Sequence, residues 1–197
     1  MHSGTGVPMD DPLAALTNAV DFAARRHGTQ TRKGSRGLPY FTHLAEVARH
    51  VAQAGADAMA ATGMPALTVL EAAYLHDSVE DGHATEAEIA TLFGPDVAAL
   101  VAELTDPPGL ADEARKQRQV DHAAEMSLAA RLIKLADKTS NVREMADDPP
   151  AGWPPEKRRA YVDWGVAVVD AGCRGIAPAL EAEFDRVVAD ARRRACA

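Results

Sequence analysis

The feature that most constrains this chain of 197 residues is the segment 72–81, where four ionisable side chains follow an apolar run. In a helix each residue advances by about 100°, which places Glu80 about 40° from His76. Asp77 and Asp81 follow at about 100° and about 140°. The segment therefore predicts one helix face that carries an imidazole and three carboxylates.

These four groups need a positive charge among them, because carboxylates on one face repel one another. A divalent metal bound by His76 and Asp77 meets this need. Glu80 and Asp81 then remain for proton transfer. The alternative, from this segment alone, is a solvated helix end.

Composition favours an all-α protein, because 47% of the residues are hydrophobic, alanine is abundant and few β-branched runs alternate. The length suits one domain, which we expect over residues 11–197. Residues 1–10 lack the basic and apolar parts of a signal peptide and are predicted to be a disordered leader.

Charge and cysteine content bear on location and partners. Cys173 and Cys196 are too few for a disulfide framework, which favours a cytoplasmic location. The net charge of −8 argues against nucleic-acid binding, and no apolar stretch is long enough to cross a membrane. The segment 25–36 nevertheless carries five Lys or Arg residues, which indicates either phosphate binding or a solvated loop. Nothing in the sequence indicates the oligomeric state.

Periodicity and capping signals divide the chain into helices. We expect helices over residues 12–27, 43–53, 66–80, 85–94, 95–104, 128–141 and 153–171, with a last helix from 178. Residues 112–125 are expected to form an exposed helix or a mobile loop, and 55–65 a connection. Thr42 is predicted to cap the second of these helices, and Tyr161 and Trp164 to lie in the core.

Two further helices carry candidate site residues. His43 lies in a first helical turn beside the basic segment, where the alternatives are a cap or a surface position. Asp137 and Asn141 lie one turn apart on a largely apolar helix, which suggests a metal ligand and a hydrogen-bonding group. The alternative for Asp137 is an ion pair with Lys134 or Lys138.

The candidate ligands contain nitrogen and oxygen donors and no thiolate. They are His43, His76, Asp77 and Asp137. Such a set suits Mn²⁺, Fe²⁺, Co²⁺ or a catalytic Zn²⁺. Their convergence from three helices is an expectation for the structure.

The order of these residues resembles the HD-domain metal phosphohydrolases. More narrowly it resembles the hydrolase domain of RelA/SpoT-type enzymes and their small stand-alone relatives, such as the metazoan SpoT homologue. The matching segments are Thr31-Arg32-Lys33, Pro39-Tyr40 with His43, Leu75-His76-Asp77 with Val79-Glu80-Asp81, and 134–138 with Asn141. The similarity covers roughly residues 13–188 in one collinear order.

The resemblance implies an all-α HD fold of about eight to ten helices, with at most a short hairpin near the basic loop. It implies one bound Mn²⁺ and a guanine nucleotide alarmone as substrate. The 3′-pyrophosphate of ppGpp or pppGpp would be removed, which leaves GDP or GTP and pyrophosphate. The synthetase domain of bifunctional relatives has no counterpart before residue 197, so we expect degradation only.

Roles follow from the resemblance residue by residue. The metal ligands correspond to His43, His76, Asp77 and Asp137, the catalytic carboxylates to Glu80 and Asp81, and the nucleotide contacts to Arg32, Lys33 and Asn141. Two positions depart from the family pattern. Leu44 replaces a proline, which should affect helix initiation, and Ser140 replaces a bulky residue, which should affect the pocket shape.

Three points stay open at the level of sequence. Either Glu80 or Asp81 could orient or deprotonate the attacking water. The same metal and basic loop could serve a phosphatase of NADPH or of another nucleotide. A catalytically silent module that binds nucleotide is a third reading, against which the intact carboxylate pair speaks.

Overall fold

The computed structural model describes residues 11–195, and within them the chain forms ten helices. They are α1 Pro12–His27, α2 Phe41–Ala52, α3 Ala56–Ala61, α4 Ala66–Leu75, α5 Glu86–Phe93, α6 Pro95–Leu104, α7 Asp112–His122, α8 Leu128–Asp147, α9 Pro155–Gly172 and α10 Pro178–Ala195. The all-α prediction and its range of helix number are confirmed. The predicted leader, residues 1–10, lies outside the described residues.

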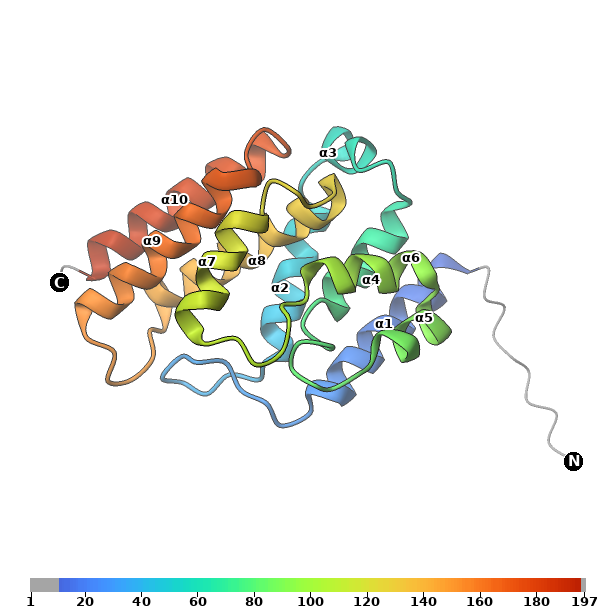
Figure 1. The fold of residues 1–197 in the computed structure, drawn as a ribbon, viewed down its shortest axis with the longest axis horizontal. Helices are drawn as coiled ribbons and strands as arrows, with labels where there is room; N and C mark the ends of the chain where they lie inside the picture. The colour runs from blue at the N-terminus through green and yellow to red at the C-terminus, as the bar shows by residue number, and fades with distance from the viewer. Residues whose placement is uncertain (1–10, 196–197) are drawn as a thin grey trace, which may run out of the picture.

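Helix α8 lies at the centre of the molecule (Figure 1). It packs against α2 on one side and against α9 and α10 on the other, and α4 packs against α1, α2 and α6. One continuous apolar core runs from Ala19 in α1 to Ala191 in α10. Because α8 is enclosed by its neighbours, even charged side chains on it, such as Lys134 and Asp137, are buried.

Side-chain hydrogen bonds cap the first turn of several helices. The Asp11 side chain accepts a hydrogen bond from the backbone N–H of Leu13 at the start of α1. The Thr85 hydroxyl caps α5 by accepting from the backbone N–H of Glu88. The predicted Thr42 cap is wrong, since α2 begins at Phe41 and the Thr42 hydroxyl donates to the Pro39 carbonyl instead.

The predicted helix over 66–80 is too long, because α4 ends at Leu75. Residues 76–82 continue as a series of turns. This segment ends as a Schellman motif, in which the N–H of His83 donates to the Ser78 carbonyl and that of Gly82 to the Val79 carbonyl. Gly82, with φ of 74°, takes the left-handed conformation that ends the turn.

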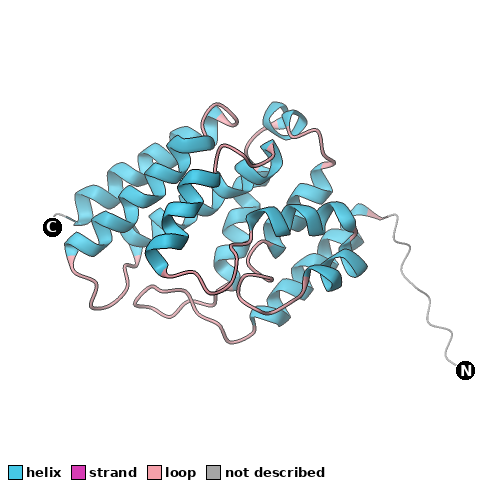
Figure 2. Cartoon of the chain, in the orientation of Figure 1, coloured by secondary structure: helices cyan, strands magenta, loops and turns pink. Residues whose placement is uncertain are grey.

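The longest connection between helices of the described residues runs through the basic segment, from α1 to α2 (Figure 2). There an isolated antiparallel bridge pairs Thr31 with Pro39, which confirms at most a short hairpin near the basic loop. The connection predicted over 55–65 contains the short helix α3. Within residues 11–195, no helix is both long and apolar enough to cross a membrane.

Candidate active site

A cavity of about 310 Å³ opens between the basic loop, the turn 76–82 and helices α7, α8 and α9. Eight of the nine predicted site residues line it, namely Arg32, Lys33, His43, Asp77, Glu80, Asp81, Asp137 and Asn141. The ninth, His76, is buried and contacts Asp77 and Asp137. Segments more than a hundred residues apart in sequence thus meet at one place.

The four predicted metal ligands converge. His43 Nε2 lies 3.5 Å from Asp77 Oδ2 and 3.4 Å from Asp137 Oδ1. His76 Nε2 lies 3.1 Å from Asp77 Oδ2 and 4.0 Å from Asp137 Oδ1. One ligand atom from each of His43, His76 and Asp137 falls within 4.8 Å of the others. Asp77 Oδ2 lies within 3.5 Å of both imidazole Nε2 atoms but does not belong to that group of three.

The other ring nitrogens show how the two histidines are oriented. His76 Nδ1 lies 2.9 Å from the Ala73 carbonyl, and His43 Nδ1 lies 3.0 Å from Ser140 Oγ. A carbonyl only accepts, so His76 carries its proton on Nδ1 when neutral. Both Nε2 atoms are buried and have no hydrogen-bond partner among residues 11–195. Two buried lone pairs aimed at two carboxylates fit a divalent cation.

The electrostatics of the cluster also favour positive charge. Burial alone would raise the pKa of Asp137, but the Lys138 ammonium and His43 lower it well below the usual range. Burial would lower the pKa of His43, but Asp137 and Asp77 raise it to about 9. The carboxylates therefore stay ionised and attract either a proton on His43 or a cation.

The ion pair that was the alternative for Asp137 is present in the structure. Lys138 Nζ forms an ion pair with Asp137 Oδ2 at 3.1 Å, and Asn141 Nδ2 donates to Asp137 Oδ1. Lys138 is buried and lies 4.2 Å above the centroid of the Trp164 ring. Burial lowers the pKa of this lysine, and Asp137 opposes that shift. The Asp137 carboxylate is thus held by two side chains of its own helix, and its Oδ1 also faces the histidines.

The two candidate catalytic carboxylates have different surroundings. Glu80 Oε2 accepts from the backbone N–H of Asp106 at 3.3 Å, and Oε1 lies 3.7 Å from Arg115. Burial, followed by the nearby charge of Asp77, raises the pKa of Glu80. A raised carboxyl pKa is the property that proton transfer near neutral pH requires.

Asp81, in contrast, is held by a side-chain network that the sequence analysis missed. Gln30 Nε2 donates to Asp81 Oδ2 at 2.8 Å. Gln30 Oε1 lies 2.7 Å from His27 Nδ1 and 2.8 Å from His83 Nε2. The two histidines therefore donate to the amide oxygen, which fixes the amide nitrogen toward Asp81. His83, in the loop that follows the turn 76–82, is part of this network.

The two cations of the basic loop also differ. Each nitrogen of the Arg32 guanidinium is already engaged: Nε with Glu144, and the other two with Glu46 and Ser140. Lys33 is exposed, lines the cavity, and lies 5.7 Å from the centroid of the Tyr161 ring. Lys33 is therefore the more available of the two charges.

Aromatic residues that were predicted otherwise also line the cavity. Tyr161 packs against the core as expected, but it and Trp164 both face the cavity. Trp164 Nε1 donates to the Lys116 carbonyl at 3.1 Å, which joins α9 to α7. Tyr40 donates to Asp77 Oδ2. Tyr40 stands in the matched Pro39-Tyr40 pair, which was the only sequence signal for its part in the site.

The two departures from the family pattern have small consequences for the cavity. Leu44 is fully buried in α2, which begins three residues earlier. Ser140 is also fully buried and does not line the cavity. The expectation that Ser140 shapes the pocket is wrong, because its side chain lies behind His43.

Comparison with known proteins agrees with this arrangement. Residues 19–163 match the family model described as HD domain. The chain is 38% identical over 182 residues to guanosine-3′,5′-bis(diphosphate) 3′-pyrophosphohydrolase MESH1 of Xenopus tropicalis, which covers 92% of this chain and 97% of that protein. It is 39% identical to the Homo sapiens protein of the same description, over 88% of this chain and 92% of that protein.

A solved structure gives the same result. The structure described as "A metazoan ortholog of SpoT hydrolyzes ppGpp and plays a role in starvation responses" superposes with a TM-score of 0.79 at 37% identity, over 88% of this chain and 93% of that chain. The HD domain implies a divalent metal, which the buried His/Asp cluster could hold. The chain belongs to the HD-domain family and, within it, to the RelA/SpoT-type hydrolases, beside the small stand-alone SpoT homologues of metazoans.

Proposed function

We propose that the chain is a metal-dependent 3′-pyrophosphohydrolase that degrades ppGpp and pppGpp to GDP and GTP with release of pyrophosphate. The observation that most supports this proposal is that the Nε2 atoms of His43 and His76 are buried, have no hydrogen-bond partner among the described residues, and face the carboxylates of Asp77 and Asp137. The relatives described above carry this activity in their descriptions. Residues 11–197 would act as one catalytic domain in the cytoplasm.

The ligands proposed for the metal are His43, His76, Asp77 and Asp137. We propose one Mn²⁺, since the donor set is nitrogen and oxygen without thiolate. Such an ion polarises a phosphoryl oxygen and lowers the pKa of a coordinated water. The protein's part is to hold two imidazoles and two ionised carboxylates in place before the metal arrives.

The remaining groups would handle the proton and the substrate charge. Glu80, whose pKa is raised, takes the proton from the attacking water. Asp81, fixed by Gln30, orients that water or the substrate. The bond between the ribose 3′-oxygen and the adjacent phosphorus would break, water would supply the oxygen that the phosphorus gains, and the ribose oxygen would take up a proton to leave as the 3′-hydroxyl. Lys33 and Asn141 would contact the nucleotide, and Arg32 would form the wall beside it.

The test is turnover of ppGpp by the purified full chain with Mn²⁺, with products identified by chromatography and EDTA as the control. We expect GDP and pyrophosphate in equal amounts, and no turnover after chelation. Release of free phosphate from NADPH, with ppGpp left intact, would support the alternative phosphatase. Binding of ppGpp without turnover of either nucleotide would support the catalytically silent module.

A further inference from the structure

The side chain behind His43 belongs to a buried network on the far side of α2 and α8 from the cavity. Ser140 Oγ lies 3.0 Å from His43 Nδ1 and 2.7 Å from Glu46 Oε2. We propose that Ser140 and Glu46 are positioning residues that set the tautomer and orientation of His43 for metal binding. This inference rests on the proposed metal centre. It goes beyond it, because neither residue contacts the Nε2 and carboxylate ligand atoms or lines the active-site cavity.

The direction of the hydrogen bonds follows from donor chemistry. An ionised carboxylate can only accept, so the Ser140 hydroxyl donates its single proton to Glu46. The Ser140 oxygen must then accept from His43, whose proton lies on Nδ1. The Nε2 lone pair is left free, and it points at Asp77 and Asp137. The network therefore selects the tautomer that a metal requires.

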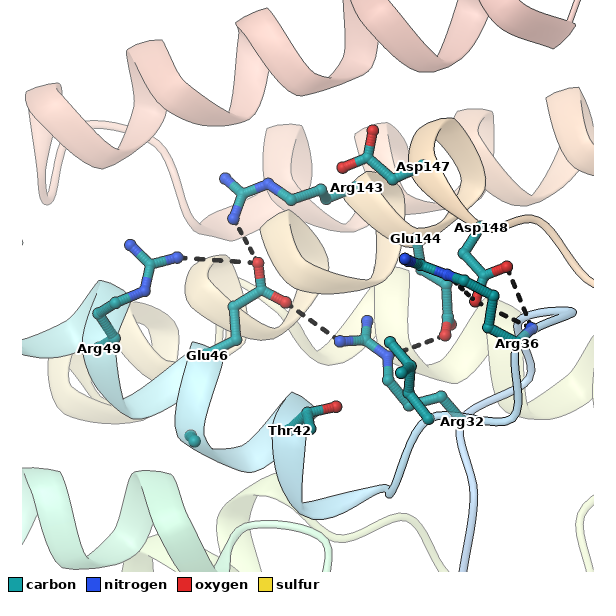
Figure 3. A pocket seen from close by; sticks show the side chains of 11 residues that line it. Arg32, Arg36, Thr42, Glu46, Arg49, Arg143, Glu144, Asp147 and Asp148 are labelled. Carbon is teal, nitrogen blue, oxygen red and sulfur yellow. Dashed lines mark hydrogen bonds and ion pairs between the residues drawn. The ribbon is translucent and has the colours of Figure 1, made fainter.

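Glu46 is held in its ionised form by the groups around it (Figure 3). The Arg32 guanidinium lies 3.1 Å from Oε2, and Arg143 contacts Oε1. Burial would raise the pKa of Glu46, but the nearby His50 imidazole, the hydrogen bond from Ser140 and the charge of Arg143 lower it well below its usual range. A carboxylate that stays ionised can only accept a hydrogen bond, so the Ser140 hydroxyl remains the donor of this one.

Arg32 joins this network to the basic loop. It donates to the Ser140 carbonyl at 3.2 Å and to Glu144 at 2.8 Å, so that it connects the loop with α8. The cavity on this side, about 430 Å³, is lined by arginines that are each paired with a carboxylate, as Figure 3 shows for Arg36 and Asp148. Balanced charges do not attract a further anion, which favours a structural role for this face.

His76 provides the internal comparison. Its Nδ1 donates to a backbone carbonyl, that of Ala73, which no substitution of a side chain removes. His43 depends instead on a hydroxyl that a single substitution deletes. Removal of the Ser140 hydroxyl should therefore weaken metal binding through His43 alone.

The experiment measures the Mn²⁺ dissociation constant of the full-length protein from the electron paramagnetic resonance signal of free Mn²⁺. Ser140→Ala deletes the hydroxyl, and Ser140→Thr keeps it. Thr139→Val is the matched control, because the Thr139 hydroxyl is equally buried on α8 but bonds only to the Leu135 carbonyl. Glu183→Ala is the control for Glu46→Ala, since Glu183 contacts Arg143 but not Ser140.

We expect Ser140→Ala to weaken Mn²⁺ binding by about 10- to 100-fold. Glu46→Ala should weaken it by a smaller factor. Ser140→Thr and the two controls should stay within about twofold of wild type. In NMR spectra of Zn²⁺-loaded, ¹⁵N-labelled protein, the His43 ring should show an Nδ1–H that is protected from exchange, and the Ser140→Ala variant should lose this protection. The unfolding temperature of the variant should stay close to that of the wild type.

Three outcomes would overturn the inference. Wild-type affinity in Ser140→Ala would overturn it while leaving the metal centre intact. An equal loss in Ser140→Thr would show that packing, not the hydroxyl, is responsible. Absence of Mn²⁺ binding in the wild type would overturn the proposed metal centre itself, and with it this inference.

Discussion

His43 and Asp137 lie inside regular helices, α2 and α8, whereas His76 and Asp77 lie where α4 has already ended. We call the first pair, with Ser140, the helical wall and the segment 76–82 the turn wall. The helical wall is held by side-chain contacts between two helices. The turn wall is held by backbone hydrogen bonds, such as those to the Ser78 carbonyl.

The difference shows what each kind of backbone can supply. Adjacent residues of a helix point about 100° apart, so a helix offers one ligand per turn to a given point. The turn wall brings two adjacent residues together, with His76 Nε2 and Asp77 Oδ2 only 3.1 Å apart. It also carries Glu80 and Asp81, the two candidate proton-transfer groups. Both walls should therefore bind metal, and only the turn wall should act on the proton.

The largest expected effect is loss of the metal from either wall. Asp77→Asn and Asp137→Asn each remove a charge that faces both histidines. We expect both variants to lose the metal, and turnover to fall to that of the EDTA-treated enzyme. Elemental analysis beside kinetics checks this. If one variant keeps the metal and its activity, then its wall does not contribute a ligand.

Glu80→Gln separates proton transfer from metal binding within the turn wall. The amide keeps the shape of the side chain but cannot accept a proton, so kcat should fall by about two orders of magnitude or more. Metal content and nucleotide affinity should stay near wild type. A metal-free Glu80→Gln protein would make Glu80 a ligand, and an unchanged kcat would remove it from the mechanism.

The pH profile gives a second test of Glu80. Because the folded protein raises its pKa, the carboxylate takes up a proton at a higher pH than a free glutamate. The ionised form is the base, so kcat/KM of the wild type should fall as the pH drops through this raised pKa. The acidic limb should be missing in Glu80→Gln. An identical limb in both proteins would assign it to another group.

Gln30→Ala tests whether the turn wall needs support from outside. Gln30 fixes Asp81 from a segment 51 residues away. We expect kcat to fall by one to two orders of magnitude, because a carboxylate that loses its partner is misplaced. Metal content should not change, because Gln30 contacts none of the proposed ligands. Arg25→Ala is the control, because Arg25 is exposed on α1 and, in the described part of the chain, pairs only with Asp21. A normal kcat in Gln30→Ala would contradict the positioning role.

The smallest expected effect on catalysis comes from the basic loop that lines the cavity. Lys33→Ala should raise KM by about tenfold with little change in kcat, since one charge-assisted phosphate contact is lost. Arg36→Ala is the matched control, because Arg36 belongs to the same loop but pairs with Asp148 outside this cavity. Equal KM values in Lys33→Ala and wild type would exclude a phosphate contact from this lysine.

The sequence predicted the helical class and the residues that meet in the cavity, because those depend on local periodicity and on the order of motifs. The helices expected over 12–27 and 95–104 depend on local signals and are confirmed at both ends. The end of α4 at Leu75 was missed. Residues 66–80 keep helical periodicity, and only the fold shows that the chain turns after Leu75.

The supporting networks could not be predicted for a different reason. Gln30 with Asp81, and Glu46 with Ser140, pair residues 51 and 94 positions apart. Such contacts arise from helix packing and leave no periodic trace in the sequence. Ser140 stood out only as a departure from a family pattern, which could not show that its hydroxyl lies behind a histidine.

Both walls should bind one and the same metal ion. Crystals soaked in Mn²⁺ and measured at the manganese absorption edge test it directly. We predict one strong anomalous peak within coordination distance of His43 Nε2, His76 Nε2, Asp77 and Asp137. No peak there, or a peak instead among His27, Asp81 and His83, the second His/Asp group of the described residues, would contradict the account.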